Sequence, residues 1–153
     1  MCLTGCSKPA NPCAGDGGTA KDGTVAACDK KVKGTPAAIS PTANSIICKS
    51  GVLVVQNNNS GPDKSCTDAH ERSHIQDWKG RYGDDLCSGV PDGSLPLGGD
   101  GYDDFIQQSE CKAYKVGKAC REQLLKTAAD ADKAAIQSAI DRDNAQIASR
   151  HCT

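Results

Sequence analysis

Residues 66–79 read CTDAHERSHIQDWK and contain neither glycine nor proline, a composition that predicts an α-helix. Ser65 resembles the residue that caps such a helix, because the acid Asp68 follows it three positions later. Gly80 and Gly83 are expected to end the helix. The remaining elements are predicted from the residues on either side of this segment.

Short strands are predicted before the helix. Residues 1–24 are rich in Gly, Pro, Lys and Asp, which favours irregular loops. Between Thr24 and Gln56, β-branched and aliphatic residues cluster in Ser45–Cys48 and in Gly51–Gln56, which indicates two or three strands. The turn-forming run from Asn57 to Asp63 separates these strands from the helix.

Two further helices are predicted after it. Residues 83–101 are rich in Gly, and a loop of this length favours a functional or disulfide-anchoring role. Apolar residues at helical spacing then extend from Asp103 to Gly117, and from Lys118 to Ser149 beyond that glycine. We therefore expect a small α+β fold in a single domain, residues 1–153, with a Cys-rich loop and strand part (1–60) and a helical part (61–153).

Cysteine is expected to compensate for a small hydrophobic core. Leu, Ile, Val and Phe make up 23 of the 153 residues, below the roughly 20% that usually supports a folded chain. Ten cysteines lie at positions 2, 6, 13, 28, 48, 66, 87, 111, 120 and 152, and five disulfides would supply the missing stability. Because disulfides persist in oxidising compartments, the protein is expected to be secreted or periplasmic.

The charge balance argues against nucleic acid as a partner. The chain has 18 Lys and Arg against 19 Asp and Glu, a net charge of −1, and only five aromatic residues on which bases could stack. No apolar run approaches the roughly 18 residues of a membrane span. The N-terminus lacks the regions of a secretory signal, so we expect a processed chain or a domain that a larger protein delivers.

The predicted helix contains the pattern H-E-x-x-H, formed by His70, Glu71 and His74. Residues four apart lie on one face of a helix, so both imidazoles can bind one metal ion while Glu71 faces the water beside it. This arrangement is typical of zinc hydrolases, and Zn²⁺ is the expected cofactor. The other interpretation is that the two histidines are ordinary surface or core residues.

A catalytic zinc site needs a third protein ligand. Glu110 is the best candidate, because it lies on the next predicted helix and because the chain uses only three Glu against sixteen Asp. An Asp, as in the aspzincin branch of these enzymes, ranks second, although neither Arg81–Asp85 nor Gly99–Asp104 fits that pattern cleanly. His151, next to Cys152, is the other possible ligand.

The residues His70, Glu71, His74 and Glu110 resemble the gluzincin branch of H-E-x-x-H metallopeptidases, in which a downstream Glu completes the metal site. The block from Cys66 to Cys120 is similar to small metallopeptidase toxin domains at the ends of bacterial Rhs, PAAR and related type VI secretion effectors. The resemblance implies a zincin-like fold, delivery into a rival cell and a cognate immunity protein. One departure is Tyr114, which stands where many gluzincins carry an Asp.

The expected reaction is hydrolysis of a peptide bond in a protein or peptide substrate. Glu71 would act as general base and then protonate the leaving amine, while Tyr102, Tyr114 or Arg81 would donate a hydrogen bond to the oxyanion. Asp68 or Asp77 would orient a histidine, and Trp78 would pack in the core or floor the cleft. The alternative function is a non-enzymatic, cysteine-rich binding or inhibitory module whose metal site is incidental or structural.

Overall fold

The computed structural model describes residues 34–153, which belong to one compact unit, Lys33–Thr153. This unit contains three helices, two small sheets and three disulfides, so the predicted mixture of α and β structure and the use of disulfides are confirmed. The loops expected in residues 1–24 and the cysteines at positions 2, 6, 13 and 28 lie outside the described residues. The single domain of residues 1–153 stays a prediction.

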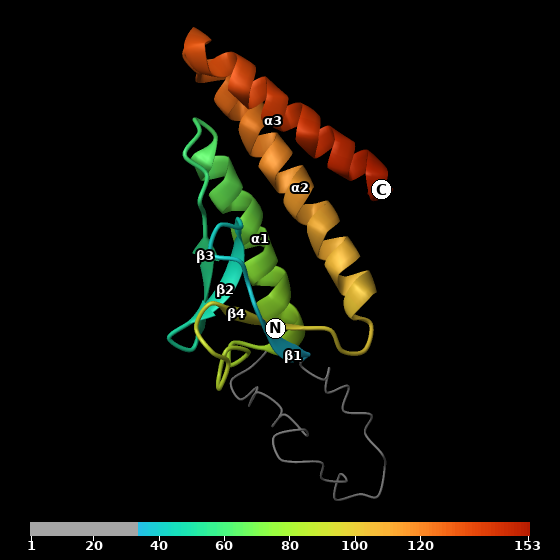
Figure 1. Ribbon diagram of the computed structural model, residues 1–153. Coiled ribbons are helices and arrows are strands. Elements are labelled where there is room, and N and C mark those ends of the chain that lie inside the picture. The colour runs from blue at the N-terminus through green and yellow to red at the C-terminus, as the bar shows by residue number, and fades with distance from the viewer. Residues whose placement is uncertain (1–33) are drawn as a thin grey trace, which may run out of the picture. The chain divides into compact units, whose positions relative to one another are not determined.

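The three helices lie side by side, and α2 is in the middle (Figure 1). Helix α1 spans Lys64–Tyr82, α2 spans Tyr102–Thr127 and α3 spans Asp130–Ser149. Helix α2 packs against α1 along one side and against α3 along the other. None of the helices between residues 34 and 153 is both long and apolar enough to cross a lipid bilayer.

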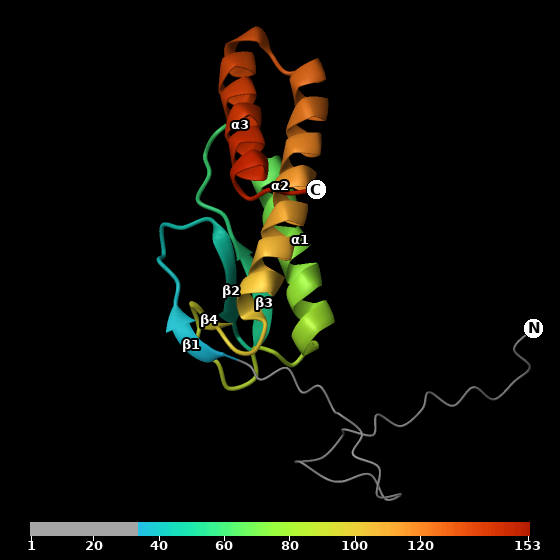
Figure 2. The same cartoon turned by 90° about the vertical axis from the view of Figure 1, so that its right-hand side faces the viewer.

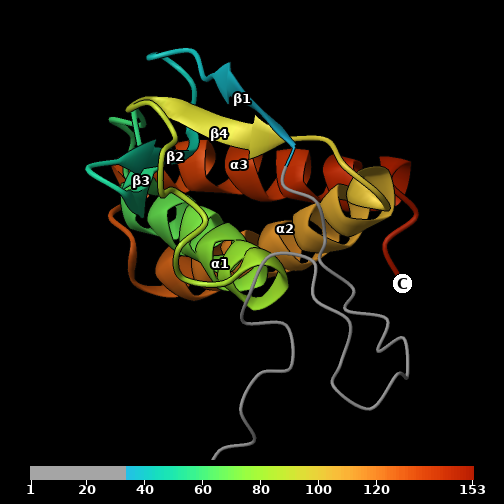
Figure 3. The same cartoon turned by 90° about the horizontal axis from the view of Figure 1, so that it is seen from below.

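Two antiparallel strand pairs cover one side of the α1–α2 pair (Figures 2 and 3). Strands β2 (Ser45–Lys49) and β3 (Val52–Gln56) form the hairpin predicted from their β-branched residues. Strands β1 (Thr35–Ala38) and β4 (Ser94–Leu97) form the second pair. Strand β4 lies inside the segment predicted to be a long loop, so that prediction was wrong for these four residues.

Helix α1 starts two residues earlier than predicted. Asp63 is its N-cap residue and no side chain caps the helix, so the capping role predicted for Ser65 was wrong. Gly80 lies within the helix, and Gly83 ends it with a positive φ of 89° and a hydrogen bond from its N–H to the Lys79 carbonyl. Only the second of the two glycines therefore acts as the predicted stop signal.

Gly117 does not separate two helices as predicted. It lies inside α2, and the break falls instead at Ala128 and Ala129, whose backbone is extended. A Cβ atom on Gly117 would lie 2.8 Å from Arg121 Nη1 and 3.5 Å from His70 Cβ. The missing side chain at position 117 therefore lets His70 of α1 approach α2 closely.

The core lies between the strands, the C-terminal end of α1 and the N-terminal end of α2. Trp78 of α1, Ile46 and Cys48 of β2, Leu95 of β4 and Leu86 are its buried members, with Cys87. The Cys48–Cys87 disulfide joins β2 to the segment after α1, which confirms a disulfide-anchoring role for the loop that follows this helix. Trp78 is 2% exposed, as expected of a core residue.

The other two disulfides connect the helices. Cys66–Cys120 joins α1 to α2, and Cys111–Cys152 joins α2 to the C-terminal residues beyond α3. All six cysteines in the described part of the chain are therefore paired. Their presence indicates an oxidising environment.

Candidate metal centre

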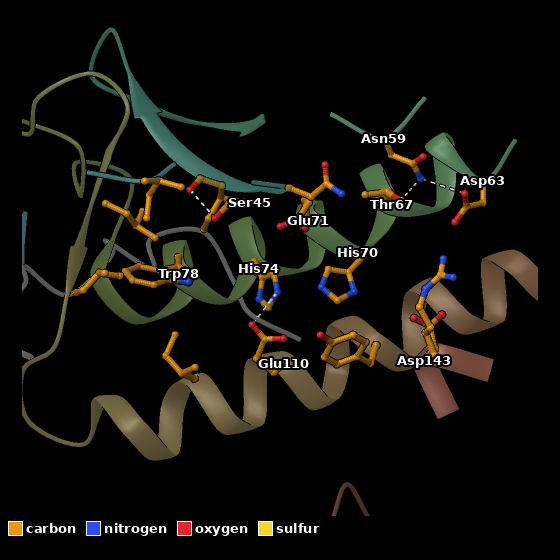
Figure 4. A pocket seen from close by; sticks show the side chains of 18 of the residues that line it. Ser45, Asn59, Asp63, Thr67, His70, Glu71, His74, Trp78, Glu110 and Asp143 are labelled. Carbon is orange, nitrogen blue, oxygen red and sulfur yellow. Dashed lines mark hydrogen bonds and ion pairs between the residues drawn. The ribbon is translucent and has the colours of Figure 1, made fainter. Parts of the chain in front are cut away.

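Helix α1 brings the two histidines and the glutamate of the H-E-x-x-H pattern together. Metal-binding atoms of His70, Glu71 and His74 lie within 4.8 Å of one another, and the two imidazole centroids are 5.0 Å apart. All three side chains line a cleft of about 610 Å³ between α1, α2 and the strands (Figure 4). The group has the composition and spacing needed to hold a metal ion.

Both imidazoles are in the neutral form that binds metals. Burial lowers the pKa of His70 to about 4; the positive charge of Arg121 acts in the same direction, as protonation of His74 would. Burial also lowers the pKa of His74, although the negative charges of Glu110 and Asp77 oppose this change. Neither histidine therefore has to lose a proton at neutral pH before it binds a cation.

A chain of hydrogen bonds orients His74. Its Nδ1 lies 2.8 Å from Ser109 Oγ of α2, and this hydroxyl donates to Asp77 Oδ2 at 3.0 Å. Asp77 is itself paired with Lys112 at 2.5 Å. Because the Ser109 proton goes to Asp77, the hydroxyl oxygen accepts from Nδ1–H, which leaves the lone pair of His74 on Nε2.

Asp77 thus acts on His74 through Ser109, whereas Asp68 accepts a hydrogen bond from Asn57 at 2.8 Å and orients neither histidine. The role of Ser109 was not predicted from the sequence. The available signal was its position directly before Glu110, since a helix that brings one of these residues to α1 brings its neighbour close as well.

Glu110 lies beside His74, although it is not part of the closest three-residue group. Its Oε1 is 3.7 Å from His74 Nε2. Both atoms are hydrogen-bond acceptors in the protonation state described above, so their approach is unfavourable unless a cation lies near both. Two ligands of a tetrahedral zinc ion are roughly 3.3 Å apart for bonds of about 2.0 Å. The separation of Glu110 from His74 is therefore close to that of two ligands on one zinc ion.

Glu71 is buried close to two other acids. Burial raises the pKa of its carboxyl to about 7, and the negative charges of Glu110 and Asp68 contribute to the increase. A cation beside these carboxylates would relieve the same repulsion. A carboxyl with a pKa near 7 is suited to exchange protons with water at neutral pH.

The two candidate tyrosines line the cleft at different places. Tyr114 of α2 contacts His70, with ring centroids 4.8 Å apart, and burial raises the pKa of its hydroxyl. Tyr102 packs against Trp78 at a centroid distance of 6.1 Å, and burial raises the pKa of its hydroxyl to about 12. Both phenols therefore stay protonated and can donate a hydrogen bond, but only Tyr114 contacts a predicted metal ligand.

Arg81 has a different role from the one predicted. Its guanidinium lies 4.8 Å from the Phe105 ring centroid and donates to the Asp100 carbonyl at 2.6 Å. It does not appear among the residues that line the cleft. Arg81 therefore supports the loop before α2.

Neither His151 nor any aspartate of residues 81–85 and 99–104 lines the cleft that contains the histidine pair. Asp84, in the first of the two aspartate-containing segments, pairs with Lys79 at 3.0 Å. His151 is exposed and lines a separate hollow on the outer side of α2. Within residues 34–153, the one group of His, Cys, Asp and Glu with metal-binding spacing is the trio on α1.

A network of buried charges lies at the end of the cleft where α3 packs against α2. Arg121 of α2 is 7% exposed and donates to Asp63 at 2.7 Å, to Asp143 of α3 at 2.6 Å and to Thr67 at 3.2 Å. One guanidinium thus faces two carboxylates. Burial raises the pKa of Asp143, whereas for Asp63 hydrogen bonds from Asn59 and Arg121 outweigh burial and lower the pKa. Neither pattern nor spacing in the sequence pointed to this network.

No protein-family model matches the chain, and no curated protein or solved structure matches it either. The catalytic function is therefore proposed from the chain's own residues.

Proposed function

We propose that the protein is a zinc-dependent metallopeptidase of the gluzincin type, with a zincin-like catalytic domain. The observation that carries the proposal is the approach of Glu110 Oε1 to within 3.7 Å of His74 Nε2, beside a neutral His70 and a buried Glu71. His70, His74 and Glu110 would hold the zinc ion. When bound, zinc polarises a carbonyl and lowers the pKa of water at its open position toward 7.

The protein's own groups supply the proton transfers. Glu71 would take a proton from the attacking water and return it to the leaving amine. The Tyr114 hydroxyl, kept protonated by burial, donates a hydrogen bond to the oxyanion. Tyr102 lies farther along the cleft, beside Trp78. We propose that it contacts the substrate and does not donate a hydrogen bond to the oxyanion.

The biological setting is proposed from the resemblance to toxin domains of type VI secretion effectors and from the disulfides. In this setting the domain is a secreted antibacterial effector that acts in the periplasm of a target cell. A cognate immunity protein would hold it inactive. The likeness rests on the block from Cys66 to Cys120.

The test combines metal analysis with peptide hydrolysis. We expect wild-type protein to bind one zinc ion per chain and to cleave peptides in a quenched fluorescent library. Glu71→Gln should keep the zinc and lose activity by about 10²- to 10⁴-fold, the usual range for a general base. Glu110→Ala should lose zinc. Glu122→Gln is the matched control, since Glu122 is exposed on α2 and paired with Lys118 at 3.5 Å.

Three results would contradict the proposal at different points. Full activity in Glu71→Gln would remove the general base, and full zinc occupancy in Glu110→Ala would remove the third ligand. Zinc bound by the wild type with four protein ligands and no hydrolysis would favour the alternative, a non-enzymatic module with a structural metal.

A further inference from the structure

The cleft follows one stripe along each of two facing helices, and its polarity changes along the stripe. The residues of α1 and its N-cap that line it are, in order, Asp63, Thr67, His70, Glu71, His74 and Trp78. Apart from the adjacent His70 and Glu71, successive members are three or four positions apart. Contacts with α2 run in the opposite direction: Trp78 meets Tyr102, His74 meets Glu110, His70 meets Tyr114 and Thr67 meets Arg121. Figure 4 shows the imidazoles between Trp78 at one end and Asp63 and Asp143 at the other.

The end beyond His74 is lined mainly by apolar residues, although Ser45 of β2 also lies on this side of the cleft (Figure 4). The apolar lining residues come from the β1 end, β2, β4, α1 and the first turns of α2, and they are Ile39, Ile46, Trp78, Leu95, Leu97, Tyr102 and Ile106. Three of them, Ile46, Trp78 and Leu95, are almost fully buried and form the floor. The other four are half-buried and leave apolar surface open to the cleft.

Most polar groups at the opposite end already have hydrogen-bond partners within the protein. The Arg121 guanidinium already donates to Asp63, Asp143 and Thr67, and Asn59 donates to Asp63 and Thr67. These groups satisfy one another and connect α1, α2 and α3. Arg142 of α3, whose charge acts on Asp143, also lines the cleft. An incoming side chain therefore meets charged groups at this end, most of them already paired, and apolar surface at the other.

We infer that the apolar end is a side-chain subsite that takes a large aliphatic or aromatic residue of the peptide substrate. The inference rests on the proposed function, because it places this substrate residue next to the peptide bond that is cleaved beside His70, Glu71 and His74. Tyr102 and Ile106 of α2 form one wall, and Ile39 and Leu97 form the strand side. Side-chain discrimination in a hydrophobic pocket typically amounts to about 10- to 200-fold.

The test measures binding without turnover. Zinc-loaded Glu71→Gln protein is titrated with N-acetyl-leucine hydroxamate and with N-acetyl-aspartate hydroxamate, and the emission of Trp78 is followed. Trp78 is the single tryptophan of the chain and lines the subsite. We expect the leucine compound to bind at least 10-fold more tightly and to change the emission at saturation.

The subsite is then altered in the same background. Ile106→Lys should reduce the preference for leucine to less than about threefold, and Ile106→Thr, a smaller change, should reduce it partly. Val116→Lys is the matched control: Val116 lies on the same helix, is 37% exposed and lines the other hollow. It should keep the preference, and circular dichroism checks the folding of each variant.

Two failures can be told apart. Equal zinc-dependent binding of both hydroxamates, or an unchanged leucine preference in Ile106→Lys and Ile106→Thr, would overturn the subsite alone. A wild-type protein that binds no zinc would overturn the proposed function and the subsite with it.

Discussion

At the Trp78 end of the α1–α2 interface the helices are joined by apolar contacts, whereas at the Arg121 end they are joined by buried charges beside the Cys66–Cys120 disulfide. The Trp78 ring lies 5.5 Å from Phe105 and 5.4 Å from Tyr82, next to the core of strands β2 and β4. At the other end, Arg121 bonds two carboxylates that belong to the start of α1 and to α3. The candidate metal centre lies between the two ends.

The two kinds of contact respond differently to loss of one partner. An apolar cluster that loses a ring loses buried area and leaves a cavity, whatever the pH. A buried ion network that loses its cation leaves unpaired carboxylates, and the cost then depends on whether they are ionised. Both ends set the distance between α1 and α2, and so the distance between the histidines and Glu110.

The largest expected effect comes from Arg121→Met. Removal of one partner of a buried ion pair costs about 3–5 kcal/mol in the free energy of unfolding at pH 7. Without the guanidinium, burial would raise the pKa of both Asp63 and Asp143, so protonation at pH 5 should restore part of the loss. Urea denaturation at the two pH values measures this.

Trp78→Ala is the companion variant. It should cost a similar 3–5 kcal/mol, roughly equally at both pH values, because no charge is left unpaired. The comparison between the two ends fails if Arg121→Met loses less than about 1 kcal/mol, or if its loss is the same at pH 5 and pH 7.

An intermediate effect should separate the two carboxylates. The pKa of Asp63 is lowered from 3.8, so its stabilising contribution is present above that pH and is lost as the pH falls through the folded-state pKa. The pKa of Asp143 is raised by burial, so keeping its carboxylate ionised in the folded protein costs free energy. Asp63→Asn should therefore destabilise the protein by about 1.5–3 kcal/mol at pH 7, and Asp143→Asn by less.

The measurement is again chemical denaturation, extended to acid pH. The difference between wild type and Asp63→Asn should shrink as the pH falls below 3.8. Equal losses for the two Asn variants at pH 7, or a difference that does not change with pH, would show that the carboxylates share the guanidinium evenly.

Local pattern was sufficient for the parts of the fold that depend on near neighbours. The helix over residues 66–79 and the strands at Ser45–Cys48 and Gly51–Gln56 follow from periodicity and β-branched content, and the structure contains all three. The spacing of His70 and His74 on one helix face is local as well. Their close approach to Glu71 therefore required no knowledge of the rest of the chain.

The missed features depend on contacts between distant segments. Gly117 looks like a helix stop, but its role is to admit His70 of another helix. Strand β4 contains Pro96, which faces Pro36 of β1, and proline argues against a strand when the partner is unknown. Arg121 meets carboxylates 58 and 22 residues away, so nothing in its local sequence marks it as the centre of a network.

The smallest expected effect on stability comes from removing the hydrogen bond from His74 to Ser109, which lies midway between the two ends. Ser109→Ala leaves Trp78 and Arg121 with their partners, so the free energy of unfolding should fall by only about 1–2 kcal/mol. Zinc affinity should fall by about 10- to 100-fold, because the imidazole loses the group that fixes its tautomer and ring orientation. Competition with a chromophoric zinc chelator measures the affinity.

The chain offers a matched control for this variant on the other side of His74. Ser73 is buried and its Oγ has no hydrogen-bond partner, so Ser73→Ala should leave zinc affinity unchanged. Ser109→Thr keeps the hydroxyl and should bind zinc more tightly than Ser109→Ala. If Ser109→Ala binds zinc as tightly as wild type, the helix contacts at the two ends suffice to orient His74. The Ser109–Asp77–Lys112 chain would then serve only to join α1 to α2.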